Sequence, residues 1–231
     1  MYPSQYRDLP AGRHAPKGSV VKAEDSANLR RALEELQALG ILLHSDATLP
    51  SVSSLVAGEP VRGSWWSHPR ANDIYEVVDG LDHHPGVIVA KLVSGKNTYV
   101  HRRLWPAIIA IGVAREPWQL EGLSSMAERL LKTVTDQGEL RTDEIPWAGG
   151  LKKDSPGEGA RQLERALLVH SDEVHTSTGA HAKRLETWER WATRVGVDEN
   201  EMTPEQGRKA FEDVLAGLNE RFQGKARLPW Q

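Results

Sequence analysis

Apolar residues recur at helical spacing along most of the chain, and short extended segments separate the helical stretches. In the first stretch, leucines recur at three- and four-residue intervals up to Gly40, which ends the first predicted helix. Residues 41–43 are all apolar, as in a short buried strand. A further helix is predicted to begin at Ser67, and its apolar positions again share one face: Ile74, Val77, Val78 and Leu81.

A predicted β-hairpin carries an unusual run of positive charge. Two strands are expected over residues 86–93 and 97–103, joined by a turn at 94–96. No acidic residue lies between Asp82 and Glu116, although the whole chain has a net charge of -3. A rigid basic surface suits contact with phosphates. We therefore predict a nucleic-acid-binding surface on this hairpin, at Lys91, Lys96, Arg102 and Arg103.

The second half of the chain is predicted to be mostly helical, with the element order of a winged helix-turn-helix. That order is helix, short helix, helix and strand, and its third helix enters the DNA major groove. A long helix and a C-terminal helix are expected to follow. The predicted fold class is therefore α+β, mostly helical, with at least one winged-helix unit and a small β-hairpin. The predicted ranges are 124–137, 142–145, 156–167, 168–176, 179–195 and 204–222.

These patterns divide the chain into four predicted parts. Residues 1–23 mix Pro, Gly and basic residues without periodicity, which is typical of a flexible arm. An α+β domain with the basic hairpin is expected over residues 24–115, and a winged-helix-like helical domain over residues 120–222. Residues 223–231 are expected to form a tail.

The third helix of the predicted winged-helix unit carries a second basic surface. Arg161 and Arg165 are four residues apart and lie one above the other, while the leucines of this helix face the core. Arg and Lys are the side chains that contact phosphates and guanine edges, so we predict DNA contacts here. The alternative is a solvated helix face partly neutralised by Glu158 and Glu164. Two lysines just before the helix extend the predicted surface, Lys152 and Lys153.

Composition excludes several classes of protein. With 231 residues, of which 39% are hydrophobic, the chain can bury one good core or two small ones. Cysteine is absent, which excludes disulfides, a thiol nucleophile and thiolate metal sites. The longest apolar runs fall far short of the roughly 20 residues that cross a membrane. The N-terminus lacks the apolar core of a secretion signal, so we expect a cytoplasmic protein without a membrane partner.

The familiar cofactor and catalytic motifs are missing. The sequence has no GxGxxG, no P-loop and no GxSxG pattern, so we expect no cofactor. Histidine is frequent, but His170, His175 and His181 lack the four-residue helical spacing of a zinc-protease motif. We therefore expect no metal site.

Trp65-Trp66-Ser67-His68-Pro69 is the most distinctive local sequence. Adjacent tryptophans at the start of a helix can stack a base or line a pocket. The helix dipole disfavours the protonated form of His68. We therefore predict a pocket at Trp65, Trp66 and His68. The alternative is that one tryptophan fills the core and the other covers the helix end.

Three groups of short stretches together indicate a family. They are LPSVSSL (49–55) with GSWW (63–66), AKLVSGK (90–96) with VHRRLWP (100–106), and EVHT (173–176) with GAHAK (179–183). In these stretches the chain resembles the AlkZ-related proteins, small relatives of the winged-helix DNA glycosylases that excise alkylated or crosslinked bases. The resemblance covers about residues 25–195. It implies winged-helix units around a basic concave channel, a role in DNA repair, and double-stranded DNA as the partner.

The same resemblance points to a catalytic motif. The glycosylases use Gln-apolar-Gln or Gln-apolar-Asp, sometimes with His first, to position water at the sugar carbon. The nearest match is His44-Ser45-Asp46, whose ends fit the His variant but whose centre is Ser instead of an apolar residue. Asp46 would then act as the base, with His44 as its positioning partner. The alternative is that these three residues form an ordinary turn.

Three functional hypotheses follow. The first is a DNA-binding relative of the glycosylases without catalysis. The second is an active glycosylase that uses His44 and Asp46. The third is an adaptor whose winged helices contact another protein, which the acidic overall charge permits.

Overall fold

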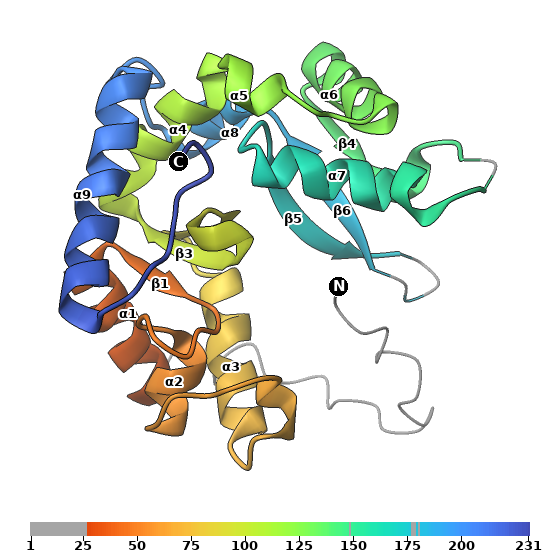
Figure 1. The fold of residues 1–231 in the computed structure, drawn as a ribbon. Coiled ribbons are helices and arrows are strands. Elements are labelled where there is room, and N and C mark those ends of the chain that lie inside the picture. The colour runs from red at the N-terminus through yellow and green to blue at the C-terminus, as the bar shows by residue number, and fades with distance from the viewer. Residues whose placement is uncertain (1–26, 148, 177–178, 180) are drawn as a thin grey trace.

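The structure is a computed structural model that describes residues 27–147, 149–176, 179 and 181–231 (Figure 1). The arm predicted over residues 1–23 lies outside the described residues. In this part of the chain, no helix is both long and apolar enough to span a membrane.

The first half of the described chain contains four α-helices and three strands (Figure 1). Strands β1, β2 and β3 form one antiparallel sheet in the order β1-β3-β2. The predicted hairpin is confirmed as β2 and β3, and a short 3₁₀ turn, Val93–Gly95, joins them. The elements are α1 (Ala27–Leu39), β1 (Ile41–Leu43), α2 (Val52–Ala57), α3 (Ala71–Asp82), β2 (Val87–Lys91), β3 (Asn97–His101) and α4 (Trp105–Ala114).

The second half follows nearly the same order of elements. Its three strands again form an antiparallel sheet in which the last strand lies in the middle, β4-β6-β5. The mostly helical α+β class predicted from the sequence is therefore confirmed. The elements are α5 (Pro117–Leu120), α6 (Ser125–Gln137), β4 (Glu139–Arg141), α7 (Pro156–Arg165), β5 (His170–His175), β6 (His181–Glu186), α8 (Trp188–Val195) and α9 (Pro204–Phe222).

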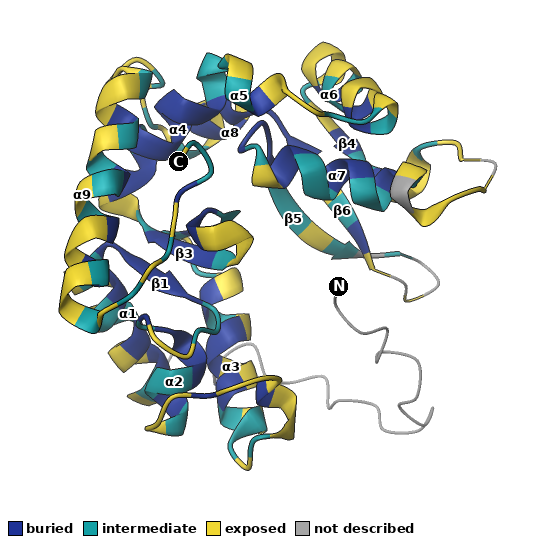
Figure 2. Cartoon of the chain, in the orientation of Figure 1, coloured by how far each residue is buried: buried dark blue, intermediate teal, exposed yellow. Residues whose placement is uncertain are grey.

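The first sheet separates two hydrophobic cores because side chains alternate between its faces. Ile41 and Val100 pair across β1 and β3 and face a core that includes α4 and α9. Leu42 and Tyr99 pair one residue along and face the core beneath α1 and α3. Figure 2 shows the buried sheet and α4 between the exposed outer surfaces of the surrounding helices.

The larger of these cores joins the two halves of the chain. Ile108 in α4 and Phe211 in α9 lie on either side of the predicted domain boundary, yet both belong to this core and are fully buried. Residues 223–231, which the sequence indicated as a tail, pack back onto the hairpin. Ser94 N donates to the Arg227 carbonyl oxygen at 2.8 Å, and Leu228 is buried in the same core. The two halves are thus joined by a continuous core.

Residues 179–195 do not form the single helix that was predicted. Residues His181–Glu186 are strand β6, and α8 begins only at Trp188. The boundary is set by Thr187, whose hydroxyl caps α8 by accepting the backbone N–H of Arg190. Pairing with β4 on one side and β5 on the other outweighs the helical spacing of the apolar residues.

Helix α3 begins later than its pattern indicated. The predicted start was Ser67, but residues Trp65–Ser67 form a separate 3₁₀ turn and α3 begins at Ala71. The Ser67 hydroxyl donates to the Ser64 carbonyl oxygen at 2.8 Å, so it stabilises the turn and does not cap the helix. The predicted core face of α3 is confirmed, since its four apolar residues are buried.

Gly207 allows α9 to approach α4 closely. A Cβ atom at Gly207 would lie 2.6 Å from the carbonyl oxygen of Ala107. Gly207→Ala is therefore expected to lower the free energy of unfolding by about 1–3 kcal/mol through overpacking. Gly217 is the matched control in the same helix, because a Cβ there meets nothing within 4 Å. Gly217→Ala should stabilise by up to about 1 kcal/mol, and equal urea-unfolding results for the two variants would contradict this packing.

Candidate nucleic-acid interface

Lys91 lies at the end of β2, where the first sheet meets α7. Its ammonium group donates to Asn97 Oδ1 at 2.5 Å, across the strand pair in which Lys91 and Asn97 are partners. Burial lowers the pKa of Lys91, the carboxylate of Glu164 raises it, and the charges of Lys183, Arg165 and Arg161 lower it further. The charges on α7 and β6 therefore act on the Lys91 amine, and β2 packs against α7.

Helix α7 presents the two predicted arginines on its solvent side. Ser155 caps the helix through its hydroxyl, as predicted, and Pro156 occupies its first turn. Arg161 Nε lies 3.0 Å and Arg165 Nη1 3.7 Å from carboxylate oxygens of one residue, Glu158. The arginine side chains remain 36% and 56% exposed, so a single surface glutamate partly neutralises both. Two leucines of the predicted core face are buried as expected, Leu163 and Leu167.

Glu164 is the buried centre of this charge arrangement. Its Oε1 accepts hydrogen bonds from the Ser171 hydroxyl and the Lys183 ammonium. Its Oε2 is buried and has no hydrogen-bond partner among the described residues. The sequence-based alternative that Glu164 lies on a solvated face is wrong, because only 8% of its side chain is exposed.

Lys91 and the three cations whose charges act on it, Arg161, Arg165 and Lys183, form a set that we name the basic cluster. They come from β2, α7 and β6, and thus from both halves of the chain. Lys183 was not predicted, because its strand was interpreted as helix. The four positive charges of the cluster face two negative ones, Glu164 beside Lys183 and Glu158 beside both arginines, so the cluster carries a net charge of +2.

The other predicted phosphate contacts lie elsewhere or are already paired. Lys96 Nζ is 2.6 Å from Asp46 Oδ2. Arg102 and Arg103 follow β3 at its far end from Lys91, and Arg103 donates to the Ala38 carbonyl oxygen at 3.2 Å. Because β3 ends at His101, Arg102 is not part of the paired hairpin, whereas Lys91 pairs with Asn97 at its opposite end. Lys152 is exposed before α7, and the side chain of Lys153 lies outside the described part of the chain.

The side chains of His44 and Asp46 have separate environments. His44 directly follows β1 and lies beside Trp65, with ring centroids 5.6 Å apart, and beside Tyr99 at 6.3 Å. Its Nε2 is buried without a partner among the described residues. Burial, reinforced by the charge of Lys91, lowers the pKa of His44 to about 4. The imidazole is therefore neutral at pH 7.

Asp46 forms a turn in which both carboxylate oxygens are occupied. Oδ1 accepts the backbone N–H groups of Thr48 and Leu49, each at 2.8 Å, and Oδ2 accepts from Lys96. Partial burial favours the neutral acid, but these donors outweigh it and hold the pKa of Asp46 below its usual value. A carboxylate held in this way is a weak base until the contact with Lys96 opens.

The predicted aromatic pocket is an exposed stack of rings instead of an enclosed site. Trp65 is buried in the core beneath α3, and Trp66 stacks on it with ring centroids 4.1 Å apart. Trp66 is 51% exposed and also contacts Tyr75 of α3. His68 Nδ1 accepts the backbone N–H of Arg70 at 3.1 Å, so His68 stabilises the turn before α3. One tryptophan thus fills the core and the other faces solvent.

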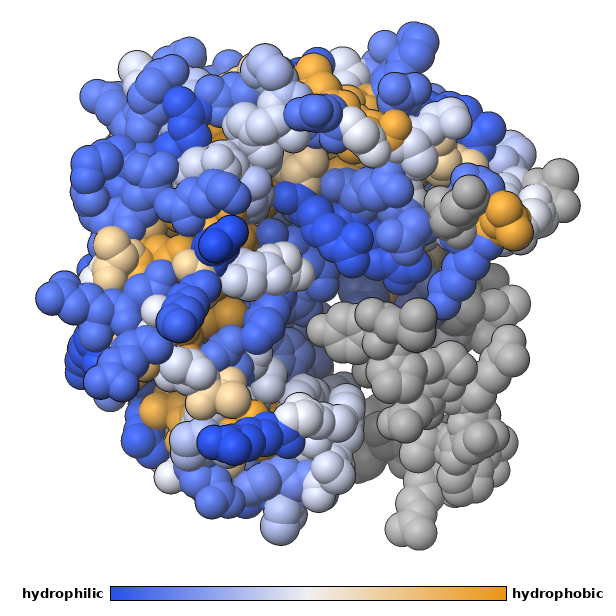
Figure 3. Space-filling model, viewed as in Figure 1, coloured by the Kyte–Doolittle hydropathy of each residue, from blue (hydrophilic) through white to orange (hydrophobic). Residues whose placement is uncertain are grey.

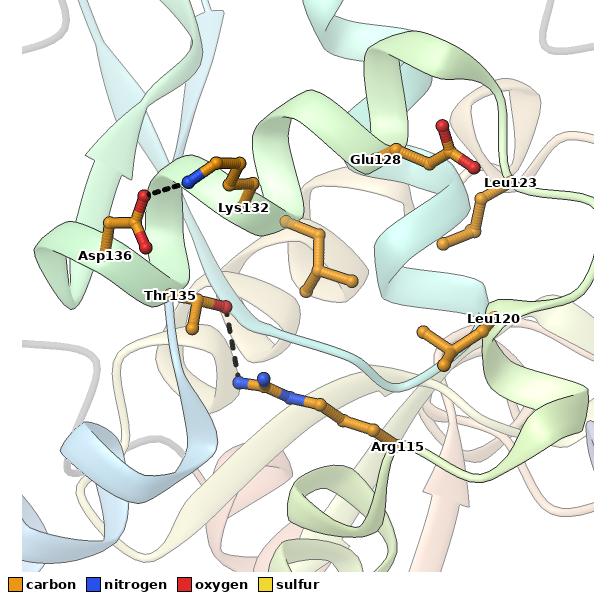
Figure 4. Close-up of a pocket in the computed structure, with 8 residues that line it drawn as sticks. Arg115, Leu120, Leu123, Glu128, Lys132, Thr135 and Asp136 are labelled. Atoms are coloured by element: carbon orange, nitrogen blue, oxygen red, sulfur yellow. Dashed lines mark hydrogen bonds and ion pairs between the residues drawn. The ribbon is translucent and has the colours of Figure 1, made fainter.

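A surface groove of about 400 Å³ lies apart from these residues, between α6 and the segment that follows α4 (Figure 4). Four of its five polar side chains form two pairs: Lys132 with Asp136 at 2.7 Å, and Arg115 with the Thr135 hydroxyl at 3.3 Å. Figure 4 shows leucines from both sides facing the groove, with no converging catalytic groups among the residues drawn.

Comparison with protein families gives one match. The model of the family described as AlkZ related matches residues 26–226, which is most of the chain. Comparisons with curated proteins and with solved structures give no match.

The environment of His44 predicts a loss of stability in acid. Its pKa is about 4 in the folded protein and about 6.5 in the unfolded chain, so the unfolded chain binds more protons between these values. Stability therefore falls as the pH drops from about 6.5 to 4, by up to about 3 kcal/mol from this residue. His44→Gln should make the free energy of unfolding fall less between pH 7 and pH 4. Urea titrations at both pH values measure the difference, and equal falls would contradict it.

Proposed function

The chain belongs to the AlkZ-related family, and on that premise we propose that it binds double-stranded DNA through the basic cluster. The observation that carries the proposal is the packing of β2, which ends at Lys91, against α7, which carries Arg161 and Arg165 and is far from β2 in the sequence. Both stretches were predicted independently as phosphate contacts. Their meeting at one junction creates a local positive charge on a chain that is acidic overall.

Each half of the chain supplies a different part of the interface. The second half has the element order of a winged helix-turn-helix, in which α7 corresponds to the helix that enters the major groove. Arg161 and Arg165 on α7 would reach the groove or its edges, exchanging Glu158 for phosphate or guanine. Lys91 and Lys183 would contact flanking phosphates and set the orientation of the duplex.

Salt dependence of duplex binding tests this proposal. Each neutralised phosphate contributes about -0.9 to the slope of log K against log salt concentration, so four cations give roughly -3 to -4. Fluorescence anisotropy with a labelled duplex of about 20 base pairs, at several salt concentrations, measures the slope. No binding at low salt, or binding that salt does not weaken, would refute the proposal and favour the protein-adaptor hypothesis.

Base excision is the second candidate function. It is favoured by the position of His44, which follows β1 and lies within electrostatic reach of Lys91 in the basic cluster. Against it stands the occupied carboxylate of Asp46, which must leave Lys96 before it can accept a proton. Release of alkylated bases from duplex DNA, compared between wild type and Asp46→Asn, tests catalysis. If the wild-type protein binds the duplex but releases no base from a panel of alkylated duplexes, the catalytic hypothesis is rejected and the binding proposal remains.

A further inference from the structure

Five aromatic rings form a continuous array from the core to the surface. The array begins at Tyr99, which is fully buried, and ends at Tyr75, which is 50% exposed. Successive ring centroids are 6.3, 5.6, 4.1 and 5.8 Å apart. In order, the rings belong to Tyr99, His44, Trp65, Trp66 and Tyr75.

The outer end of the array is held in place before any ligand arrives. Trp65 packs into the core and covers one face of Trp66. Two hydrogen bonds hold the surrounding turn. The backbone N–H of His68 donates to the Trp65 carbonyl oxygen at 3.0 Å, and the Ser67 hydroxyl donates to the Ser64 carbonyl oxygen. Two large aromatic side chains, each half exposed and side by side, form a prepositioned stacking surface. Such preorganisation reduces the entropy that binding must overcome.

The inner end of the array lies beside the basic cluster. His44, the second ring of the array, donates its backbone N–H to the carbonyl oxygen of Asn97 at 2.9 Å, and Asn97 is the cross-strand partner of Lys91. The outer end has a different electrostatic character, because Glu76 and Asp79 are neighbours of Tyr75 on the exposed side of α3. Arg70, directly before α3, is paired with Asp73 at 2.8 Å, so phosphates are attracted more strongly to the cluster than to the outer rings. The group best suited to Trp66 and Tyr75 is a neutral aromatic base next to a duplex backbone held at Lys91.

From this arrangement we propose that Trp66 and Tyr75 stack an unpaired base that projects from DNA bound at the basic cluster. The protein then prefers duplexes with an extrahelical nucleotide over fully paired ones. The proposal rests on the proposed function, because the cluster must hold the duplex. It adds a substrate class, since an aromatic surface accepts any base by stacking and does not depend on its sequence.

The test compares two duplexes of equal length and flanking sequence, one fully paired and one with a single bulged nucleotide. Anisotropy titrations give the ratio of their dissociation constants for wild type and variants. Wild type is expected to bind the bulged duplex about tenfold or more tightly, in line with the strength of base stacking on aromatic side chains. Trp66→Ala and Tyr75→Ala, made separately, should bring the ratio close to one and leave the affinity for the paired duplex unchanged. Trp66→Phe should restore part of the preference.

Trp147→Ala is the matched control, because Trp147 is 43% exposed and lies in the other half of the chain. For this variant, the ratio of the dissociation constants for the paired and bulged duplexes should equal that of the wild-type protein. The two levels of the proposal fail in different ways. If the wild-type protein binds neither duplex, the proposed function itself is refuted. Equal affinity of wild type for both duplexes, or a preference that survives in both alanine variants, overturns the stacking site. Either of these last results would leave Trp66 and Tyr75 as a contact surface for a protein.

Discussion

Replacing Lys91 and Arg165 together with glutamate is expected to weaken duplex binding by about 100-fold or more at low salt. Each replacement removes one phosphate contact and places a carboxylate near the DNA backbone, where like charges repel. The slope of log K against log salt concentration is negative, and its magnitude should decrease by about two units. Lys91 is partly buried and feels the charge of Glu164, so thermal unfolding of the variant is measured first, and binding is compared at a temperature at which it is folded.

The matched control reverses two lysines on other surfaces. Lys132 in α6 and Lys209 in α9 are 77% and 67% exposed, and each pairs with an aspartate one turn away. Lys132→Glu with Lys209→Glu changes the net charge by the same amount and should weaken binding only slightly. Equal losses in the two double variants would mean that overall charge, and not the basic cluster, governs binding.

Glu158→Gln provides a change of opposite sign. Glu158 is the carboxylate shared by Arg161 and Arg165, so its neutralisation should free both guanidinium groups for DNA. We expect the affinity for duplex DNA to rise a few fold. A decrease would show that Glu158 orients the arginines for binding.

Lys183→Met is expected to be the most destabilising change near the cluster. It leaves the Glu164 carboxylate buried without its ion-pair partner, which typically costs about 3–5 kcal/mol. The melting temperature should fall by roughly 10 °C or more for a chain of this size. Combining Lys183→Met with Glu164→Gln should recover much of the loss, because the buried charge is then removed.

Lys132→Met serves as the control for this experiment. Lys132 and Asp136 form an ion pair of similar chemistry, but both side chains are largely exposed. Exposed pairs contribute about 0–1 kcal/mol, so this variant should unfold almost as wild type does. If Lys183→Met and Lys132→Met have the same small effect, Glu164 is not held by the ion pair described here.

Local patterns predicted those parts of the fold in which one face of an element is buried. The apolar positions of α3, the buried run Ile41–Leu43 and the alternation through the hairpin each follow from simple periodicity. The start of α8 was predicted wrongly. Thr187 can be recognised as the N-cap of this helix only if the preceding residues are known to form strand β6. Strand β6 in turn depends on pairing with β4, which is distant in the sequence.

The sequence predicted the candidate site as two separate basic surfaces. It did not predict that the two surfaces meet. Glu164 was interpreted as exposed, although it shares the helical spacing of Ala160 and Leu163, both buried. That spacing was a usable signal for a buried carboxylate that requires a partner. Lys183 supplies the partner, but no local pattern connects it with α7 or with Lys91. Such a cluster depends on tertiary contacts, which sequence periodicity does not encode.

Hydrogen exchange of the protein with and without a short DNA duplex tests the central claim most directly. If both halves form one interface, binding should slow amide exchange together at the end of β2 near Lys91, along α7, and at β6 around Lys183. The exposed side of α9 should be unchanged. Protection confined to one half of the chain, or no protection when the duplex is saturating, would contradict the account.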